Sequence, residues 1–467
     1  MNLETKRKQL FKNTGILAIG TILSRILTFF LIPLYTIYLT TEDYGYVDLL
    51  QTIAYLLLPI ISLELYCAVF RFIIEEKNKL NIDKIICTAF AINAISLILM
   101  LIVLFIISFF VSHSNTIVFF LYFVSLLVFT NLQFIIRGYG NNKFFSFISF
   151  FNTIVSLILN LIFIVILKYK ALYILVAIII SNIISIIIII IKNPILHVFK
   201  KSNISTIYAK KMLLYSLPLI PNEVSWWVVN TSDRIIISKV LSLASNGIYA
   251  VANKIPLVYT TIFGVFNTAW VESVSRGIND SNSNEFISDM YIKCFKLFSC
   301  ICLGIICGMS LTFNFFIDID YSKSYYHILI LTIAIFFNSL SSLIGSILTG
   351  YKRTASIGKT TIMGAIINLT INIAFIKIIG LYAASISTLI SYVVIFIIRT
   401  IEVNKIQKLK YPIRYIPFLL INLVIVSVGY IYKNTLINLI IIIYLLIFSL
   451  FVNKELLLDF IPLRKGK

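Results

Sequence analysis

Several charged side chains lie inside apolar stretches of the sequence, and the types of six of them indicate what chemistry the protein could perform. They are Arg25, Glu64, Glu223, Asp233, Arg234 and Lys254. At about 1.5 Å of rise per helical residue, Arg25, Glu64 and Glu223 would lie about 16 to 20 Å from the nearest charged end of their stretches. At that depth of a bilayer a charge costs roughly 2.5–3.5 kcal/mol unless it faces a partner or a water-filled cavity. We therefore treat all six as candidate substrate-binding residues.

The cations of this set could hold an anionic group. Arginine offers a planar fork of donors for phosphate oxygens, and lysine offers a compact charge. Two structural alternatives stay open. Arg234 would reach the outer interface at the end of an unbroken helix, where its side chain could extend to lipid headgroups. Arg25 and Glu64 could instead form an ion pair between the first two spans.

The composition indicates which elements must position these charges. The chain has 467 residues, of which 60% are hydrophobic and 12% are charged, and its mean hydropathy is +1.00. Apolar runs long enough to cross a bilayer as helices recur throughout. An all-α membrane protein with about fourteen spans is expected, over Gly15–Leu39, Val47–Ile74, Ile85–Val111, Thr116–Ile136, Phe144–Leu167, Leu172–Ile191, Met212–Leu241, Ile248–Val271, Cys294–Ile317, Ile328–Leu348, Thr360–Ile379, Leu381–Ile398, Tyr415–Tyr430 and Leu436–Phe451.

The distribution of Lys and Arg predicts the orientation. With the amino terminus in the cytosol, most of the 39 basic residues fall in cytosolic segments, as the positive-inside rule requires, and the carboxyl terminus is cytosolic too. The basic start MNLETKRKQLFKNTG precedes an apolar run that is too long for a cleavable signal. The net charge of +20 therefore reflects membrane topology. Nucleic-acid binding is not expected, because the basic residues are scattered among short loops.

Two parts of the sequence resemble each other and predict a repeated architecture. YLTTEDYGYVDLL from Tyr38 aligns with VLSLASNGIYAVA from Val240, which pairs Gly45 with Gly247. A unit of six spans keeps both copies in one orientation, related by a pseudo-twofold axis along the membrane normal. We expect an N-terminal lobe over residues 1–191, a basic cytosolic linker over 192–211, a C-terminal lobe over 212–400, and two further spans with a cytosolic tail over 401–467.

The segment LPLIPNEVSWWVVNTSDRIIISKVL, from Leu217, is unusually polar for a span. Pro218 and Pro221 should bend it in its inner half, because proline removes a helix hydrogen bond. Amides such as Asn152 and Asn368 could glue helices together, and collectively they suit a cargo with many hydroxyls. A wet path along one face of this segment would explain why its charges are retained.

Catalysis and metal binding are not expected. The cysteines (Cys67, Cys87, Cys294, Cys300, Cys302 and Cys307) lie in or beside apolar stretches, where they behave as small hydrophobic residues. The three histidines are far apart. Asp318 and Asp320 could imitate a motif of a membrane glycosyltransferase or polymerase, but the predicted outer loops are too short to hold an acceptor. We expect no enzyme and no cofactor.

Two motifs resemble a known superfamily. PLIPNEVSWWVVNTSDRIIIS with the following GIYAVANKIP, and LSRILTFFLIPLYTIYLTTEDYGYVDL near the start, are similar to the polysaccharide-exporter branch of the multidrug/oligosaccharidyl-lipid/polysaccharide (MOP) export superfamily, including Wzx-type O-antigen flippases. The resemblance implies alternating-access transfer of a polyprenyl-diphosphate-linked oligosaccharide, an O-antigen or capsule repeat unit used in lipopolysaccharide or polysaccharide biosynthesis, across a bacterial cytoplasmic membrane. Arg25 would then stabilise the diphosphate, with Arg234 and Lys254 as the next positions outward.

The resemblance also implies partners and rival functions. The partners would be the lipid-linked glycan, membrane lipids, and a polymerase or other glycan-assembly proteins. A multidrug or cation antiporter, or a lipid II-type flippase of the same superfamily, is the alternative. The first span holds no acidic residue from Thr14 to Thr40, whereas the related antiporters usually keep an aspartate there. This departure disfavours the antiporter.

Overall fold

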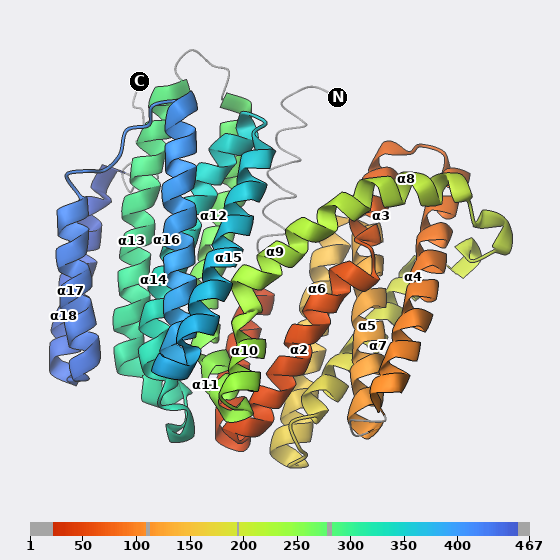
Figure 1. Ribbon diagram of the computed structural model, residues 1–467, viewed down its shortest axis with the longest axis horizontal. Helices are drawn as coiled ribbons and strands as arrows, with labels where there is room; N and C mark the ends of the chain where they lie inside the picture. The colour runs from red at the N-terminus through yellow and green to blue at the C-terminus, as the bar shows by residue number, and fades with distance from the viewer. Residues whose placement is uncertain (1–21, 109–112, 194–195, 278–282, 456–467) are drawn as a thin grey trace, which may run out of the picture. The chain divides into compact units, whose positions relative to one another are not determined.

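The computed structural model describes residues 22–108, 113–193, 196–277 and 283–455, and within these ranges every regular element is a helix (Figure 1). The chain divides into two compact units, Met1–Gly247 and Ile248–Lys467. The lobe boundaries expected from the repeat stay a prediction. The start of the first predicted span, the end of the third and the C-terminal tail lie outside the described residues.

The helices of the first unit pack around a hydrophobic core. That core joins Leu65, Ile85, Leu132, Ile148 and Met212, which come from five different helices. The elements are the helix Ile22–Tyr38, α2 (Thr41–Ile61), α3 (Leu65–Glu75), α4 (Lys79–Ser108), α5 (His113–Gly138), α6 (Asn142–Asn160) with a π-helical turn at Leu161–Ile166, α7 (Tyr173–Lys192), 3₁₀ turns at Leu196–Val198 and Lys201–Asn203, α8 (Thr206–Ser216), a 3₁₀ turn at Leu217–Leu219, α9 (Ile220–Thr231), α10 (Asp233–Val240) and the start of α11 (Leu243–Lys254).

The second unit is built around α14, which packs against α12, α13 and α16, while α17 and α18 pack on α13 (Figure 1). A buried arginine ties three of its helices together: Arg399 of α16 donates to Thr360 Oγ1 at 3.0 Å, Thr361 Oγ1 at 3.1 Å and the Ser341 carbonyl at 3.1 Å. The elements after α11 are α12 (Pro256–Gly277), α13 (Ser283–Phe316), a 3₁₀ turn at Ile319–Tyr321, α14 (Ser324–Gly350), α15 (Thr354–Ile379), α16 (Leu381–Ile406), α17 (Ile416–Tyr432) and α18 (Thr435–Val452).

The helices confirm a multi-pass, all-helical membrane protein. Within the described residues, 11 helices are long and apolar enough to cross a membrane, and Ile22–Tyr38 and Ile416–Tyr432 are shorter apolar helices. The bend expected from Pro218 and Pro221 is present, because α8 and α9 are separated by the 3₁₀ turn at Leu217–Leu219.

Two further breaks were not expected from the sequence. The stretch Val47–Ile74 is interrupted after Ile61, where Leu63 and Glu64 both adopt positive φ, at 51° and 54°. The stretch beginning at Ile248 changes helix at Ile255, directly before Pro256. Proline cannot donate to the preceding turn, which accounts for the second break.

Candidate functional site

A line of polar contacts joins α2 to α9, α10 and the start of α11, all within the first unit. We call it the α2–α9 seam and define it by Gly45, Asp48, Thr52, Glu64, Glu223, Trp227, Arg234, Asn246 and Gly247. Figure 1 shows α9 and α10 running beside α2, and these helices are in contact. The bent, broken course of α8 to α10 brings its polar side chains onto α2.

Gly45 and Gly247 form one end of the seam, where two helix backbones touch. A Cβ atom on Gly45 would lie 1.9 Å from the Leu243 carbonyl oxygen, and one on Gly247 would lie 2.0 Å from the Thr41 carbonyl oxygen. Both distances are far inside van der Waals contact, so only glycine fits at either position. Each glycine faces the carbonyl of the residue four positions before the other. The two copies of the repeated motif therefore cross each other symmetrically.

A buried ion pair lies next to this crossing. Nη1 of Arg234 is 2.9 Å from Oδ1 of Asp48 and 3.3 Å from Oγ1 of Thr52. Asn246 donates to the Gly45 carbonyl at 2.8 Å and lies 3.5 Å from Oδ2 of Asp48. Only 2% of the Asp48 side chain and 16% of the Arg234 side chain are exposed. The cation is thus neutralised by a neighbour in this conformation.

A tryptophan fixes the middle of the seam. Nε1 of Trp227 on α9 donates to the Thr52 carbonyl of α2 at 3.1 Å. The indole therefore holds the two helices together between the ion pair at one end and the acidic residues at the other.

Two carboxylates lie toward the other end. Glu64 is 1% exposed, and its left-handed backbone is supported by a hydrogen bond from its N–H to Ser62 Oγ at 3.2 Å. The Tyr66 hydroxyl donates to the Glu64 carboxylate. Glu223 on α9 is exposed. Asn222 donates to Glu223 at 3.3 Å.

The structure places the predicted site residues in different surroundings. Glu64, Glu223 and Arg234 belong to the seam, and Asp233 is buried at the start of α10. Arg25 is exposed on the helix Ile22–Tyr38. Lys254 is half-buried at the end of α11 and belongs to the second unit.

The ion-pair alternative for Arg25 and Glu64 is not realised. Within the part of the chain that the structure describes, no ion pair joins the two, and the Glu64 carboxylate accepts its hydrogen bond from Tyr66. Sequence reasoning also missed Asp48, which pairs with Arg234. The available signal was its position as the one acid in the apolar part of the repeated motif, three residues after Gly45.

Two of the amides predicted to face a wet path join neighbouring helices. Asn152 of α6 donates to Asn182 Oδ1 at 3.0 Å and Ser185 Oγ at 3.1 Å on α7. Asn368 of α15 donates to Ser387 Oγ at 3.4 Å and Thr388 Oγ1 at 3.3 Å on α16. Hydrogen bonds of this kind stabilise helix association in lipid. Asn152 and Asn368 therefore join helices, and the role of the amides in binding a cargo stays a prediction.

The fold is similar to that of solved membrane transporters. A lipid II flippase MurJ in an inward closed conformation is similar over 94% of this chain and 99% of that one, with a TM-score of 0.73 and 19% identity. An inward-facing multidrug resistance MATE family transporter of the MOP superfamily covers 84% of this chain and 94% of its own, at a TM-score of 0.62 and 13% identity. A mutant of the Vibrio cholerae MATE transporter VcmN is similar over 85% of this chain and 96% of its own, with a TM-score of 0.57 and 13% identity.

A family model assigns the chain within this fold. The model of the polysaccharide biosynthesis protein family matches residues 10–271, which is more than half of the chain and includes the whole seam. The chain therefore belongs to the polysaccharide biosynthesis protein family. No curated protein matches the sequence.

Proposed function

We propose that the protein is a flippase that moves a polyprenyl-diphosphate-linked oligosaccharide, an O-antigen or capsule repeat unit, from the inner to the outer leaflet of a bacterial cytoplasmic membrane. The observation that carries the proposal is the family match over residues 10–271, because all six candidate charged residues fall inside it. A polymerase and other glycan-assembly proteins would supply and receive this cargo.

The proposed architecture has fourteen spans, both termini in the cytosol, and two six-span lobes followed by two further spans. The 11 long helices, the two shorter apolar helices and the broken segment α8 to α10 support this number. The reciprocal packing of Gly45 and Gly247 supports the twofold relation of the repeated motifs. Alternating access is the expected motion of such a parallel repeat.

The charged residues receive distinct proposed roles. Arg25, exposed on the first described helix, would bind the diphosphate. The diphosphate carries the charge of the cargo, and charge is the most costly feature to move through the hydrocarbon layer. Arg234 is held by Asp48 at 2.9 Å, so it would bind phosphate only after that pair opens. Lys254 would be a further cation on the way out. The carboxylates of Glu64 and Glu223 would accept hydrogen bonds from glycan hydroxyls.

A cation or multidrug antiporter is the second candidate, and one observation favours it. The carboxylates of Glu64, which is buried, and Glu223, which is exposed on α9, would suit a cationic substrate better than an anionic one. A lipid II-type flippase would share the phosphate chemistry and differ only in the sugar. The cargo itself therefore distinguishes the three.

The test is deletion of the gene followed by mass spectrometry of the polyprenyl-linked glycans that accumulate. The flippase proposal predicts accumulation of one completed repeat unit on the cytosolic side, restored to normal by wild-type protein but not by Arg25→Ala. Arg25→Lys should restore part of the export, because the charge remains and the fork is lost. Arg71→Ala is the matched control, since Arg71 pairs with Glu75 on the exposed surface of α3. Sensitivity to cationic drugs without glycan accumulation would favour the antiporter.

A further inference from the structure

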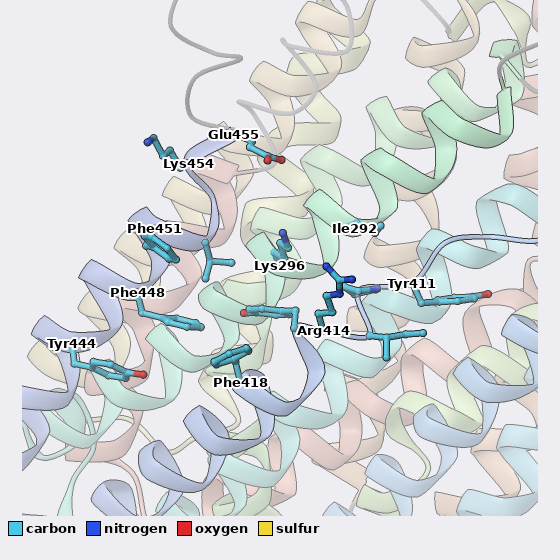
Figure 2. A pocket seen from close by; sticks show the side chains of 14 residues that line it. Ile292, Lys296, Tyr411, Arg414, Phe418, Tyr444, Phe448, Phe451, Lys454 and Glu455 are labelled. Atoms are coloured by element: carbon cyan, nitrogen blue, oxygen red, sulfur yellow. The ribbon is translucent and has the colours of Figure 1, made fainter.

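The second unit contains a pocket that the proposed transport path does not use. It has a volume of about 940 Å³ and lies between the start of α13, the start of α17 and the end of α18. This volume is within the range of small-molecule sites, roughly 300–1,000 Å³. Figure 2 shows aromatic side chains along one part of the pocket, with Phe448 and Phe451 from α18 and Phe418 from α17.

Three cations line the pocket. They are Lys296 of α13, Arg414 just before α17, and Lys454 just after α18. Figure 2 shows Lys296, Arg414, Lys454 and Glu455 among the side chains that line the pocket. Glu455 is the only acid among the described residues of the lining. Within the described ranges, no carboxylate forms an ion pair with any of the three cations.

The aromatic part of the pocket is held in place by its own contacts. The ring of Tyr415 stacks on Phe448 at 6.2 Å between centroids and 17° between planes, and Tyr444 stacks on Phe448 at 6.0 Å and 26°. The Tyr415 hydroxyl is 2.7 Å from Ser299 Oγ of α13. Because these side chains already pack together, a ligand would meet a pocket that is largely formed in advance.

The expected topology would place the pocket at one membrane surface. With the topology expected from the positive-inside rule, the start of α13, the start of α17 and the end of α18 all face the cytosol. The cations would then lie at the depth of the lipid headgroups, and the aromatic rings beside the upper acyl chains. Phosphate oxygens suit the fork of Arg414 and the ammonium group of Lys296, and basic pockets between helices on the cytosolic side are known to bind acidic headgroups.

We propose that this pocket binds an anionic phospholipid of the cytosolic leaflet. The phosphate would contact Lys296 and Arg414, and the first methylene groups of the acyl chains would pack on Phe418 and Phe448. The ligand is a resident lipid that supports α17 and α18 against α13, and it is separate from the transported cargo.

Native mass spectrometry of the full-length protein, titrated in detergent with phosphatidylglycerol, phosphatidylcholine or a polyprenyl diphosphate, tests the proposal. Wild-type protein should bind phosphatidylglycerol preferentially. Removal of both charges in the double variant Lys296→Gln/Arg414→Gln should weaken binding about 30-fold, at roughly fivefold per charge near a headgroup. The swap Lys296→Arg/Arg414→Lys keeps the charge and should retain most of the affinity.

The control is Arg353→Gln/Lys359→Gln, which also removes one arginine and one lysine from the second unit. Neither residue lines the pocket. The control variant should change the affinity less than about twofold. Three results would overturn the proposal. They are equal binding of the two phospholipids, an equal loss in the control, and a preference for polyprenyl diphosphate over phosphatidylglycerol that depends on Lys296 and Arg414. The last result would assign the pocket to the cargo carrier.

Discussion

The buried pair of Asp48 and Arg234 gives the sharpest test of how the α2–α9 seam is stabilised. In Asp48→Ala the Arg234 guanidinium keeps its buried position, with 16% of its side chain exposed, and loses its carboxylate. Removing one partner of a buried pair costs roughly 3–5 kcal/mol, because the remaining charge is left without compensation. We expect a loss of about 3 kcal/mol, at the lower end of that range, since Thr52 still accepts a hydrogen bond from Arg234 at 3.3 Å.

A surface pair of almost the same length provides the comparison. Arg71 and Glu75 are 3.0 Å apart, but their side chains are 53% and 55% exposed. Glu75→Ala should therefore leave the free energy of unfolding close to that of the wild-type protein. Burial, and not distance, separates the two cases.

Equilibrium unfolding in mixed micelles of mild detergent and dodecyl sulfate would measure both variants. The double variant Asp48→Ala/Arg234→Leu should recover much of the stability, because neither charge is then left buried. If Asp48→Ala costs no more than Glu75→Ala, or if the double variant is as unstable as the sum of its parts, the pair does not stabilise the seam as described.

Two further predictions concern close packing and pH. Gly45→Ala and Gly247→Ala should each cost about 1–3 kcal/mol or more in the same unfolding assay, because the new methyl group would lie 1.9 or 2.0 Å from a carbonyl oxygen. Gly264→Ala, whose added Cβ would meet no atom within 4 Å, should show no loss, and equal effects at all three sites would contradict the close crossing. In the loop after α3, hydrogen bonds led by the backbone N–H of Asn78 lower the pKa of Glu76 below its ordinary 4.5. The contribution of the Glu76 carboxylate to stability should be fully present above pH 4.5 and lost as the pH falls through the lowered pKa. A melting temperature that is the same for wild type and Glu76→Gln at pH 7 would contradict this prediction.

The sequence predicts the helices well because their signal is local. Apolar runs of sufficient length indicate spans, and Pro218 and Pro221 predict the bend that separates α8 from α9. The alignment of Gly45 with Gly247 was readable from the repeat. That the two glycines contact each other was not, because it depends on how segments about two hundred positions apart are packed.

The rest depends on tertiary contacts that leave little trace in the sequence. The positive φ of Leu63 and Glu64 is uncommon outside glycine, so nothing local indicates a helix break there. The Asp48 and Arg234 partners are 186 positions apart, and either charge alone is compatible with many partners. The aromatic and basic pocket near Arg414 combines residues from three helices, each of which is ordinary for the end of a span.

Reconstitution of the purified protein into vesicles tests the central claim most directly. A polyprenyl-diphosphate-linked oligosaccharide would be placed in one leaflet, and its arrival in the other leaflet would be followed with a lectin that does not cross the membrane. The account predicts transfer by wild-type protein and by Arg71→Ala, and little transfer by Arg25→Ala. Transfer by Arg25→Ala at the wild-type rate would contradict the role of Arg25. Absence of transfer by correctly folded wild-type protein under any applied ion gradient would contradict the proposed function itself.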